Sequence, residues 1–295
     1  MHIANLRLPL VVAGFLLLGF SVGVARAQSP AVTLTPALVE AGSPELIRVL
    51  AQDADAVDGD WQGHKLEFFR GDSGRAWFAL AGIDVESQTG PSTLKIAVNN
   101  RGTAQEISRT IEIHPAHYRT GSLSVAPKFV EPDPAALKEI DAESQLKAKA
   151  FASTAHEPLW RGTFHAPVPA QATDSFGTRR MFNGKLASIH KGADFRAAAG
   201  TPVRASNSGI VVLARPLYFE GNCVIIDHGL GLFTLSMHFS RIDVHEGQRV
   251  KAGDRLGLSG ATGRVTGPHL HWAVRWQNAY LDPVKLLHLN LNAVN

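Results

Sequence analysis

Cysteine is almost absent from this chain of 295 residues, in which Cys223 is the single thiol. One cysteine cannot form an intramolecular disulfide, so the fold cannot depend on disulfide bonds. Cys223 lies in an apolar run, residues 222–226, where we expect a buried thiol. A catalytic cysteine needs an accessible, electropositive setting instead. A disulfide-based scaffold is therefore excluded, and cysteine catalysis is disfavoured.

An excess of charge of either sign is also missing. The formal net charge of the full chain is +3. Loss of Arg7 and Arg26 with an amino-terminal leader would leave 27 basic against 26 acidic residues, a net charge of about +1. A chain this close to neutral lacks the basic field by which nucleic-acid-binding domains attract phosphates. We therefore expect no nucleic-acid partner.

Long apolar runs are confined to the amino terminus. A short basic start precedes apolar residues 8–24, and Ala25 and Ala27 flank Arg26 in the pattern of a signal-peptidase site. The run is at the short limit of a membrane-spanning helix, roughly 17–25 residues, and it contains three glycines. We expect residues 1–27 to be a signal peptide cleaved after Ala27. The mature protein would then be periplasmic or secreted, with no stable membrane span.

Two common hydrolase signatures are missing as well. The chain has neither an HExxH zinc motif nor a GxSxG nucleophile elbow. It does contain HKGAD at residues 190–194 and HLH at residues 269–271. Gly192 disfavours a helix across the first fragment, since glycine costs about 1 kcal/mol relative to alanine there. Alternate residues of a strand point to the same face, which would place His269 and His271 side by side.

These two fragments supply three histidines and one carboxylate. Catalytic zinc sites use such ligands and leave one coordination position for water. A chance HxH is common in a chain with 13 histidines, so an isolated pair is more often a surface or core feature. Both fragments, however, lie in one strand-rich region, with His238 at the end of an apolar run between them. The combination favours a metal site.

Residues 161–284 resemble the LytM/lysostaphin-type zinc endopeptidases, which cut peptide cross-links in bacterial cell walls. The matching stretches follow the family's order: SFGTRR at 175–180 with Asn183 and Gly184, HKGADF at 190–195, GTPVRA at 200–205, GNCVIIDHG at 221–229, Met237 with His238, VKAGDRLG at 250–257, and GATGRVTGPHLHW at 260–272.

The resemblance implies roles for five side chains. His190, Asp194 and His271 correspond to the ligands of one Zn²⁺ per chain. His238 and His269 correspond to the histidines that flank the metal-bound water and the scissile carbonyl, although the sequence does not assign the general base. The family usually has Tyr two residues before the histidine that matches His238. Here that position is Ser236, which predicts a changed aromatic wall. Arg180 and Asn183 either line the groove or support the fold.

The chain is expected to be mainly β, with two domains and a connecting helix. Residues 31–126 contain short β-rich runs separated by turns, typical of a small sandwich, and resemble the amino-terminal β domain of some exported Gram-negative members. Residues 127–160 predict a linker whose helix begins at Asp133 and Pro134. For residues 161–290 the resemblance implies an antiparallel sheet with a groove that carries the metal. We expect the first domain to pack on the second and partly restrict this groove.

Together these features predict an exported zinc endopeptidase that hydrolyses the peptide stems of peptidoglycan. The Gram-negative-like architecture favours D-alanyl-diaminopimelate cross-links. The alternative is a non-catalytic regulator or activator of another cell-wall hydrolase. That class is expected to lack ligands, whereas all five site residues are present here.

Overall fold

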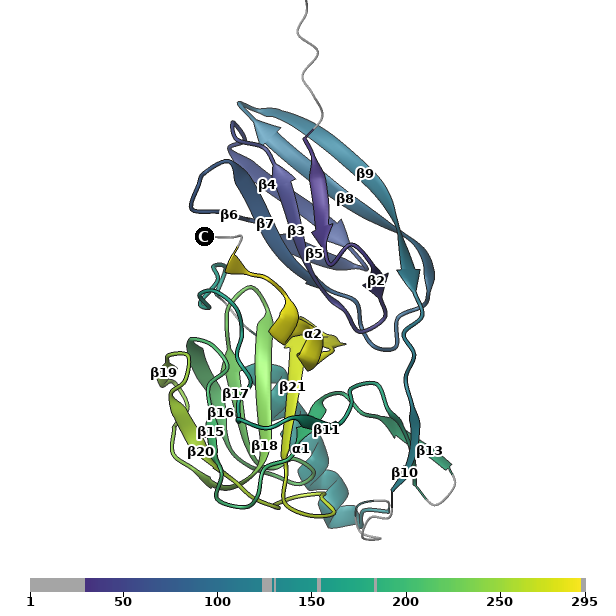
Figure 1. Ribbon diagram of the computed structural model, residues 1–295, viewed down its shortest axis with the longest axis vertical. Helices are drawn as coiled ribbons and strands as arrows, with labels where there is room; N and C mark the ends of the chain where they lie inside the picture. Colours follow the sequence, from purple (N-terminus) through teal and green to yellow (C-terminus); the bar gives the residue numbers. More distant parts are fainter. Residues whose placement is uncertain (1–29, 124–128, 130, 153–154, 183–184, 293–295) are drawn as a thin grey trace, which may run out of the picture.

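The computed structural model describes residues 30–123, 129, 131–152, 155–182 and 185–292. The predicted signal peptide lies outside these residues. Two β-rich units are stacked along the long axis of the molecule, and α1 lies beside the lower one (Figure 1). No helix within the described ranges is both long and apolar enough to cross a membrane.

The amino-terminal unit is a sandwich of two sheets, as predicted. One sheet has the order β1-β3-β7-β6 and the other β2-β9-β8-β4-β5. In β8, Leu94, Ile96 and Val98 are buried and alternate with more exposed residues, because alternate side chains face the opposite sheet. The strands are β1 Val32–Thr35, β2 Val39–Glu40, β3 Pro44–Leu50, β4 Ala56–Trp61, β5 His64–Glu67, β6 Phe69–Arg70, β7 Ala76–Gly82, β8 Gly90–Asn100 and β9 Thr103–His114.

The predicted connecting helix is present as α1, Pro134–Ala150. The side chain of Asp133 accepts hydrogen bonds from the backbone N–H groups of Ala135 and Ala136, and so caps the helix. Its buried residues are Ala136 and Glu143, so the buried face is narrow. This face contacts β16 of the carboxy-terminal unit.

The carboxy-terminal unit is built on a ten-stranded sheet, whose central order is β11-β14-β21-β18-β17-β16-β19. Its pairings are antiparallel. The elements are β11 Ala172–Asp174, β14 Ala193–Phe195, β15 Pro202–Arg204, β16 Gly209–Leu217, β17 Gly221–Asp227, β18 Leu232–Ile242, β19 Arg249–Val250, β20 Arg255–Ser259, β21 Leu270–Trp276, β22 Ala279–Leu281 and α2 Pro283–His288.

One face of this sheet is covered by α1. Cys223, Leu235 and Ala273 form a buried cluster on that face, and Phe151 at the end of the helix packs against it. Cys223 is fully buried, as expected for a core thiol. Burial also raises its pKa well above the usual value, so the thiol stays protonated.

A small three-stranded sheet stands beside the main one. It contains β10 Thr120–Leu123, β12 Arg179–Phe182 and β13 Lys185–Ile189. β12 and β13 form an antiparallel hairpin, and β10 pairs with β12 in parallel. The two sandwich sheets end at His114. β10 therefore belongs structurally with the second unit, although it lies within the range 31–126.

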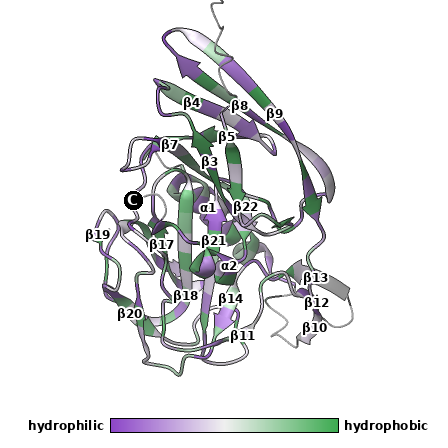
Figure 2. Ribbon diagram, turned by 45° about the horizontal axis from the view of Figure 1, so that its top comes forward, coloured by the Kyte–Doolittle hydropathy of each residue, from purple (hydrophilic) through white to green (hydrophobic). Residues whose placement is uncertain are grey.

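The two units share one continuous apolar core, which runs from β3 and β7 into β21 and β22 (Figure 2). A Cβ on Gly82 of β7 would lie 2.5 Å from a side-chain carbon of Leu281. Polar contacts surround this core, including an ion pair of 2.7 Å between Lys285 and Glu40. The expected packing of the first domain on the second is therefore observed.

Candidate metal centre

Three predicted ligands come together on neighbouring strands. Asp194 of β14 and His271 of β21 are direct partners in an antiparallel pair, and His190 lies just after β13. His190 Nε2 is 3.1 Å from Asp194 Oδ1 and 3.0 Å from His271 Nδ1. His271 Nδ1 is 2.8 Å from Asp194 Oδ1. The three donor atoms thus form a small, nearly regular triangle.

This triangle fits a zinc ion. Zinc bonds of about 2.0–2.1 Å in a tetrahedral site place neighbouring donors about 3.3 Å apart. The observed separations of 2.8–3.1 Å are slightly shorter. Two imidazole nitrogens and one carboxylate oxygen are also zinc's preferred donors. The residues present could therefore hold the metal with small outward shifts.

Neighbouring groups orient the three donors. The Nδ1–H of His190 donates to the carbonyl of Ser175 at 3.1 Å, which leaves Nε2 for a metal. Arg180 Nη2 donates to Asp194 Oδ2 at 2.8 Å, which leaves Oδ1 facing the histidines. The sequence left the role of Arg180 open, and the structure places it on the carboxylate.

Gly192 is needed for the close packing of the centre. A Cβ at this position would lie 2.4 Å from His271 Nε2 and 2.8 Å from the carbonyl oxygen of Trp272. A side chain would therefore displace the histidine. This steric role could not be read from the HKGAD motif alone.

His238 and His269 stand together beside the triangle. Their ring centroids are 5.0 Å apart, and the His238 ring is 6.1 Å from that of His271. Each Nδ1–H donates to a backbone carbonyl at 2.8 Å, that of Thr262 for His238 and that of Gly267 for His269. Both rings therefore keep Nε2 for other partners. All five residues singled out from the sequence are gathered in one place.

The backbone at His238 is strained. Its φ angle is +66°, in the left-handed region that non-glycine residues rarely adopt. The register of the β17–β18 pairing shifts nearby, between Asn222 and Val224. The His238 N–H leaves the ladder and donates to the Glu220 carbonyl at 3.0 Å. Strain of this kind persists only when the surrounding contacts hold it.

The protonation states suit metal binding. Burial raises the pKa of Asp194, but hydrogen bonds with His190 and His271 outweigh it and hold the pKa of this carboxyl well below its usual value. Burial lowers the pKa of His271. Burial and the nearby His271 and His269 lower the pKa of His238 to about 3. At neutral pH the carboxylate of Asp194 is therefore ionised and the imidazole of His271 is neutral, the forms that ligate metals.

A groove crosses the centre. One arm has a volume of about 470 Å³ and includes Gly121 of β10 and residues 264–269. The other arm, about 250 Å³, includes Lys191, Glu220 and Tyr280. Four residues line both arms: Arg180, His238, Arg264 and His271.

The sandwich contributes nothing to these walls. None of the described residues between 31 and 114 lines either arm. Among the described residues of the range 31–126, Gly121 of β10 does so. Restriction of the groove by the first domain stays a prediction.

The position of Ser236 supplies no aromatic ring to the groove. Ser236 is buried in β18 opposite Trp272 and lines neither arm. Phe219 and Tyr280 line the second arm instead. The Arg264 guanidinium lies over the Phe219 ring, 4.5 Å from its centroid. Neither Arg264 nor Phe219 was singled out from the sequence, because a lone arginine in a loop carries no spacing signal.

An antiparallel sheet, a groove, and a His/Asp/His triangle on its floor together match the architecture expected of a LytM/lysostaphin-type metallopeptidase. Residues 188–283 match the model of peptidase family M23, so this part of the chain is a peptidase M23 domain.

Known relatives agree with this assignment. The peptidoglycan DD-endopeptidase ShyA of Vibrio cholerae is 46% identical over 119 residues, 39% of this chain and 28% of that protein. The DD-carboxypeptidase/endopeptidase Mpg of Neisseria meningitidis is 41% identical over 98 residues, 33% of this chain and 23% of that protein. The chain thus spans only about a quarter of the length of these relatives.

A solved structure extends the likeness beyond the peptidase unit. A crystal structure from Pseudomonas aeruginosa, assigned to peptidase M23, has a TM-score of 0.65 and 29% sequence identity. The match covers 84% of this chain and 94% of that chain. The family model covers only residues 188–283, so the shared fold includes the amino-terminal sandwich.

Proposed function

We propose that this protein is an exported zinc endopeptidase that hydrolyses the peptide cross-links of peptidoglycan. One observation carries the proposal: a three-donor triangle lies in an open groove with two further histidines beside it. The match to relatives named peptidoglycan DD-endopeptidases supports the substrate class. The peptide stems of peptidoglycan are then its partner.

The side chains divide the chemistry between them. His190, Asp194 and His271 would hold one Zn²⁺ per chain, and a bound ion supplies a Lewis acid that acidifies water and polarises a carbonyl. His238 and His269 handle protons at Nε2, since each Nδ1 is bonded to a carbonyl. One takes a proton from the attacking water and the other serves the leaving amine or the developing oxyanion. Arg180 holds the carboxylate of Asp194 in place.

The groove also favours the D-alanyl-diaminopimelate bond. In that cross-link a free carboxylate lies on the carbon next to the scissile nitrogen. Two guanidinium groups, those of Arg180 and Arg264, line both arms of the groove beside the metal centre. Guanidinium groups bind carboxylates with charge-assisted hydrogen bonds. A glycine bridge would offer them no such partner.

Export is part of the proposal. Peptidoglycan lies outside the cytoplasm, and the sequence predicts a signal peptide over residues 1–27 with cleavage after Ala27. The mature protein would act in the periplasm or after secretion. The alternative class, a non-catalytic activator of another hydrolase, is disfavoured because His190, Asp194 and His271 form a complete donor set.

Digestion of purified sacculi tests the proposed function. We expect the mature protein, residues 28–295, to release peptides whose masses correspond to opened cross-links. A chelator should abolish the release and added Zn²⁺ should restore it. Sacculi whose cross-links stay intact under all conditions would contradict the assignment. Activation of a separately added amidase would instead favour the regulator.

A further inference from the structure

The turn between β16 and β17, residues 218–220, forms hydrogen bonds to residues on one side of the groove. The carbonyl of Glu220 accepts the backbone N–H of His238 at 3.0 Å, and that of Phe219 accepts the N–H of Arg264 at 2.9 Å. Just beyond the turn, Asn222 N–H donates to Thr262 Oγ1 at 2.9 Å. The Thr262 carbonyl in turn accepts from the His238 ring. The strained backbone of His238 is therefore held through this turn.

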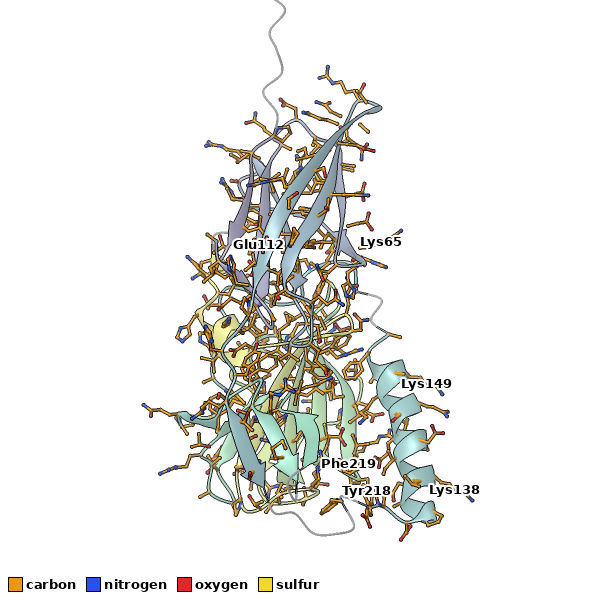
Figure 3. All side chains as sticks on the ribbon, turned by 90° about the vertical axis from the view of Figure 1, so that its right-hand side faces the viewer. Lys65, Glu112, Lys138, Lys149, Tyr218 and Phe219 are labelled. Atoms are coloured by element: carbon orange, nitrogen blue, oxygen red, sulfur yellow. The ribbon has the colours of Figure 1, made fainter. Side chains whose placement is uncertain are left out.

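The same turn is held from outside by α1. Both carboxylate oxygens of Glu143 accept the backbone N–H of Tyr218, each at 2.9 Å. Lys147 Nζ lies 2.5 Å from Glu220 Oε1. Glu143 and Lys147 are four residues apart and therefore share one helix face. Tyr218 and Phe219 lie beside the helix in Figure 3.

These contacts are more sheltered than an ordinary surface ion pair. The side chains of Lys147 and Glu220 are 25% and 14% exposed, and Glu143 is buried. By contrast, Lys138 and Lys149 of the same helix are exposed and project away from the sheet (Figure 3). Of these three lysines, Lys147 faces the turn and forms the ion pair with Glu220.

We propose that α1 is a positioning element of the groove: Glu143 and Lys147 fix the 218–220 turn, and the turn fixes His238 and Arg264. The inference rests on the proposed function. It gives the linker helix a part in turnover, although none of its described residues lines the groove. Lys147 and Glu143 are positioning residues and do not touch substrate.

The test replaces Lys147 in the zinc-loaded mature protein, with a soluble cross-linked muropeptide as substrate. We expect Lys147→Met to lower kcat roughly tenfold to a hundredfold, since small misplacements of a reacting group cost that much. KM and zinc content should stay within twofold of the wild type, because the metal ligands stand on other strands. Lys147→Arg should recover most of the rate. The matched control, Lys149→Met, should behave as the wild type.

The nitrogen-correlated ring resonances of His238 give a readout independent of turnover. Lys147→Met should shift them and Lys149→Met should not. Unchanged kcat and unchanged resonances in Lys147→Met would overturn the proposal. So would a loss of rate that only follows a loss of bound zinc or of folded protein. If the wild type does not cleave the peptide, the proposed function fails, and the His238 resonances alone decide whether α1 positions this ring.

Discussion

Asp194 holds the largest share of the contacts in the metal centre. Its Oδ1 is 2.8 Å from His271 Nδ1 and 3.1 Å from His190 Nε2, and its Oδ2 accepts from Arg180. A carboxylate so surrounded by donors remains ionised far below its usual pKa. Each histidine has fewer such contacts, so the loss of one histidine should leave the carboxylate in place but the donor set incomplete.

His271→Ala should remove zinc from the protein. With two of three protein donors left, the ion is held too weakly to survive dialysis. Metal analysis of the dialysed variant should give a stoichiometry near zero, against one per chain for the wild type. His245→Ala is the matched control, since His245 is an exposed histidine outside the groove, and it should keep its zinc. A dialysed His271→Ala protein with full zinc content would remove this residue from the ligand set.

His238→Ala should keep its zinc and lose turnover. A residue that moves a proton in the transition state contributes about 10²–10⁴-fold to the rate, and His238 is outside the donor triangle. The measurement combines metal analysis with kcat on a soluble cross-linked peptide. Loss of the metal would instead make His238 a ligand, and an unchanged kcat would end its assignment as a proton carrier.

At the scale of elements, a second kind of buried histidine directly follows β17. His228 is completely buried, with Nδ1 2.7 Å from the Ser208 carbonyl and Nε2 2.9 Å from Thr234 Oγ1. It packs edge-on against Phe164, with ring centroids 5.0 Å apart. His228 is not among the residues that line either arm of the groove. Its role is structural.

His228 should make stability depend on acid pH. Burial lowers its pKa to about 4, from 6.5 in the unfolded chain. The unfolded state therefore binds the proton more readily, and stability present above pH 6.5 is lost as the pH falls toward 4. The shift corresponds to about 3 kcal/mol. Urea unfolding at pH 7 and pH 4.5 should show a smaller decrease in unfolding free energy for His228→Gln than for wild type. Equal decreases would contradict the assignment.

Local patterns in the sequence predicted the elements that depend on local rules. Alternation at Leu94, Ile96 and Val98 predicted a half-buried strand, and Asp133 with Pro134 predicted the start of α1. The proximity of Asp194 and His271 was predicted from the resemblance to a known family, which implied that both are metal ligands. Contacts between distant segments carry no such signal. The parallel pairing of β10 with β12, and the contacts of Lys147 and Arg264, depend on how the chain folds back on itself.

At the scale of the whole molecule, the two units are packed around a shared apolar core. The sandwich supplies no described residue to the groove. The segment that follows the sandwich contains β10 and α1, which both pack against the peptidase unit. The peptidase unit therefore depends on chain that precedes it. We therefore expect that residues 188–283, which match the family model, are not self-sufficient.

A truncated protein starting near Glu157 should lose activity. It lacks β10, which pairs with the strand that carries Arg180, and it lacks the helix that holds the 218–220 turn. It also exposes the apolar side chain of Leu281 at the former junction with Gly82. We expect slower cleavage of a soluble cross-linked peptide and a lower melting temperature than for the mature chain. A faster truncated protein would mean that the amino-terminal part does obstruct the groove.

Because β14 pairs directly with β21, a zinc ion bound at this site would also affect the stability of the fold. Asp194 and His271 are 77 positions apart in the sequence. An ion bound to both would therefore link two distant segments of the chain. Such a site does not exist in the unfolded chain, so the free energy of zinc binding would add to the stability of the folded state. In a chain with a single cysteine, the ion would supply a long-range link of the kind that disulfides supply in other proteins. Removal of zinc would then lower the stability of the sheet that carries β14 and β21.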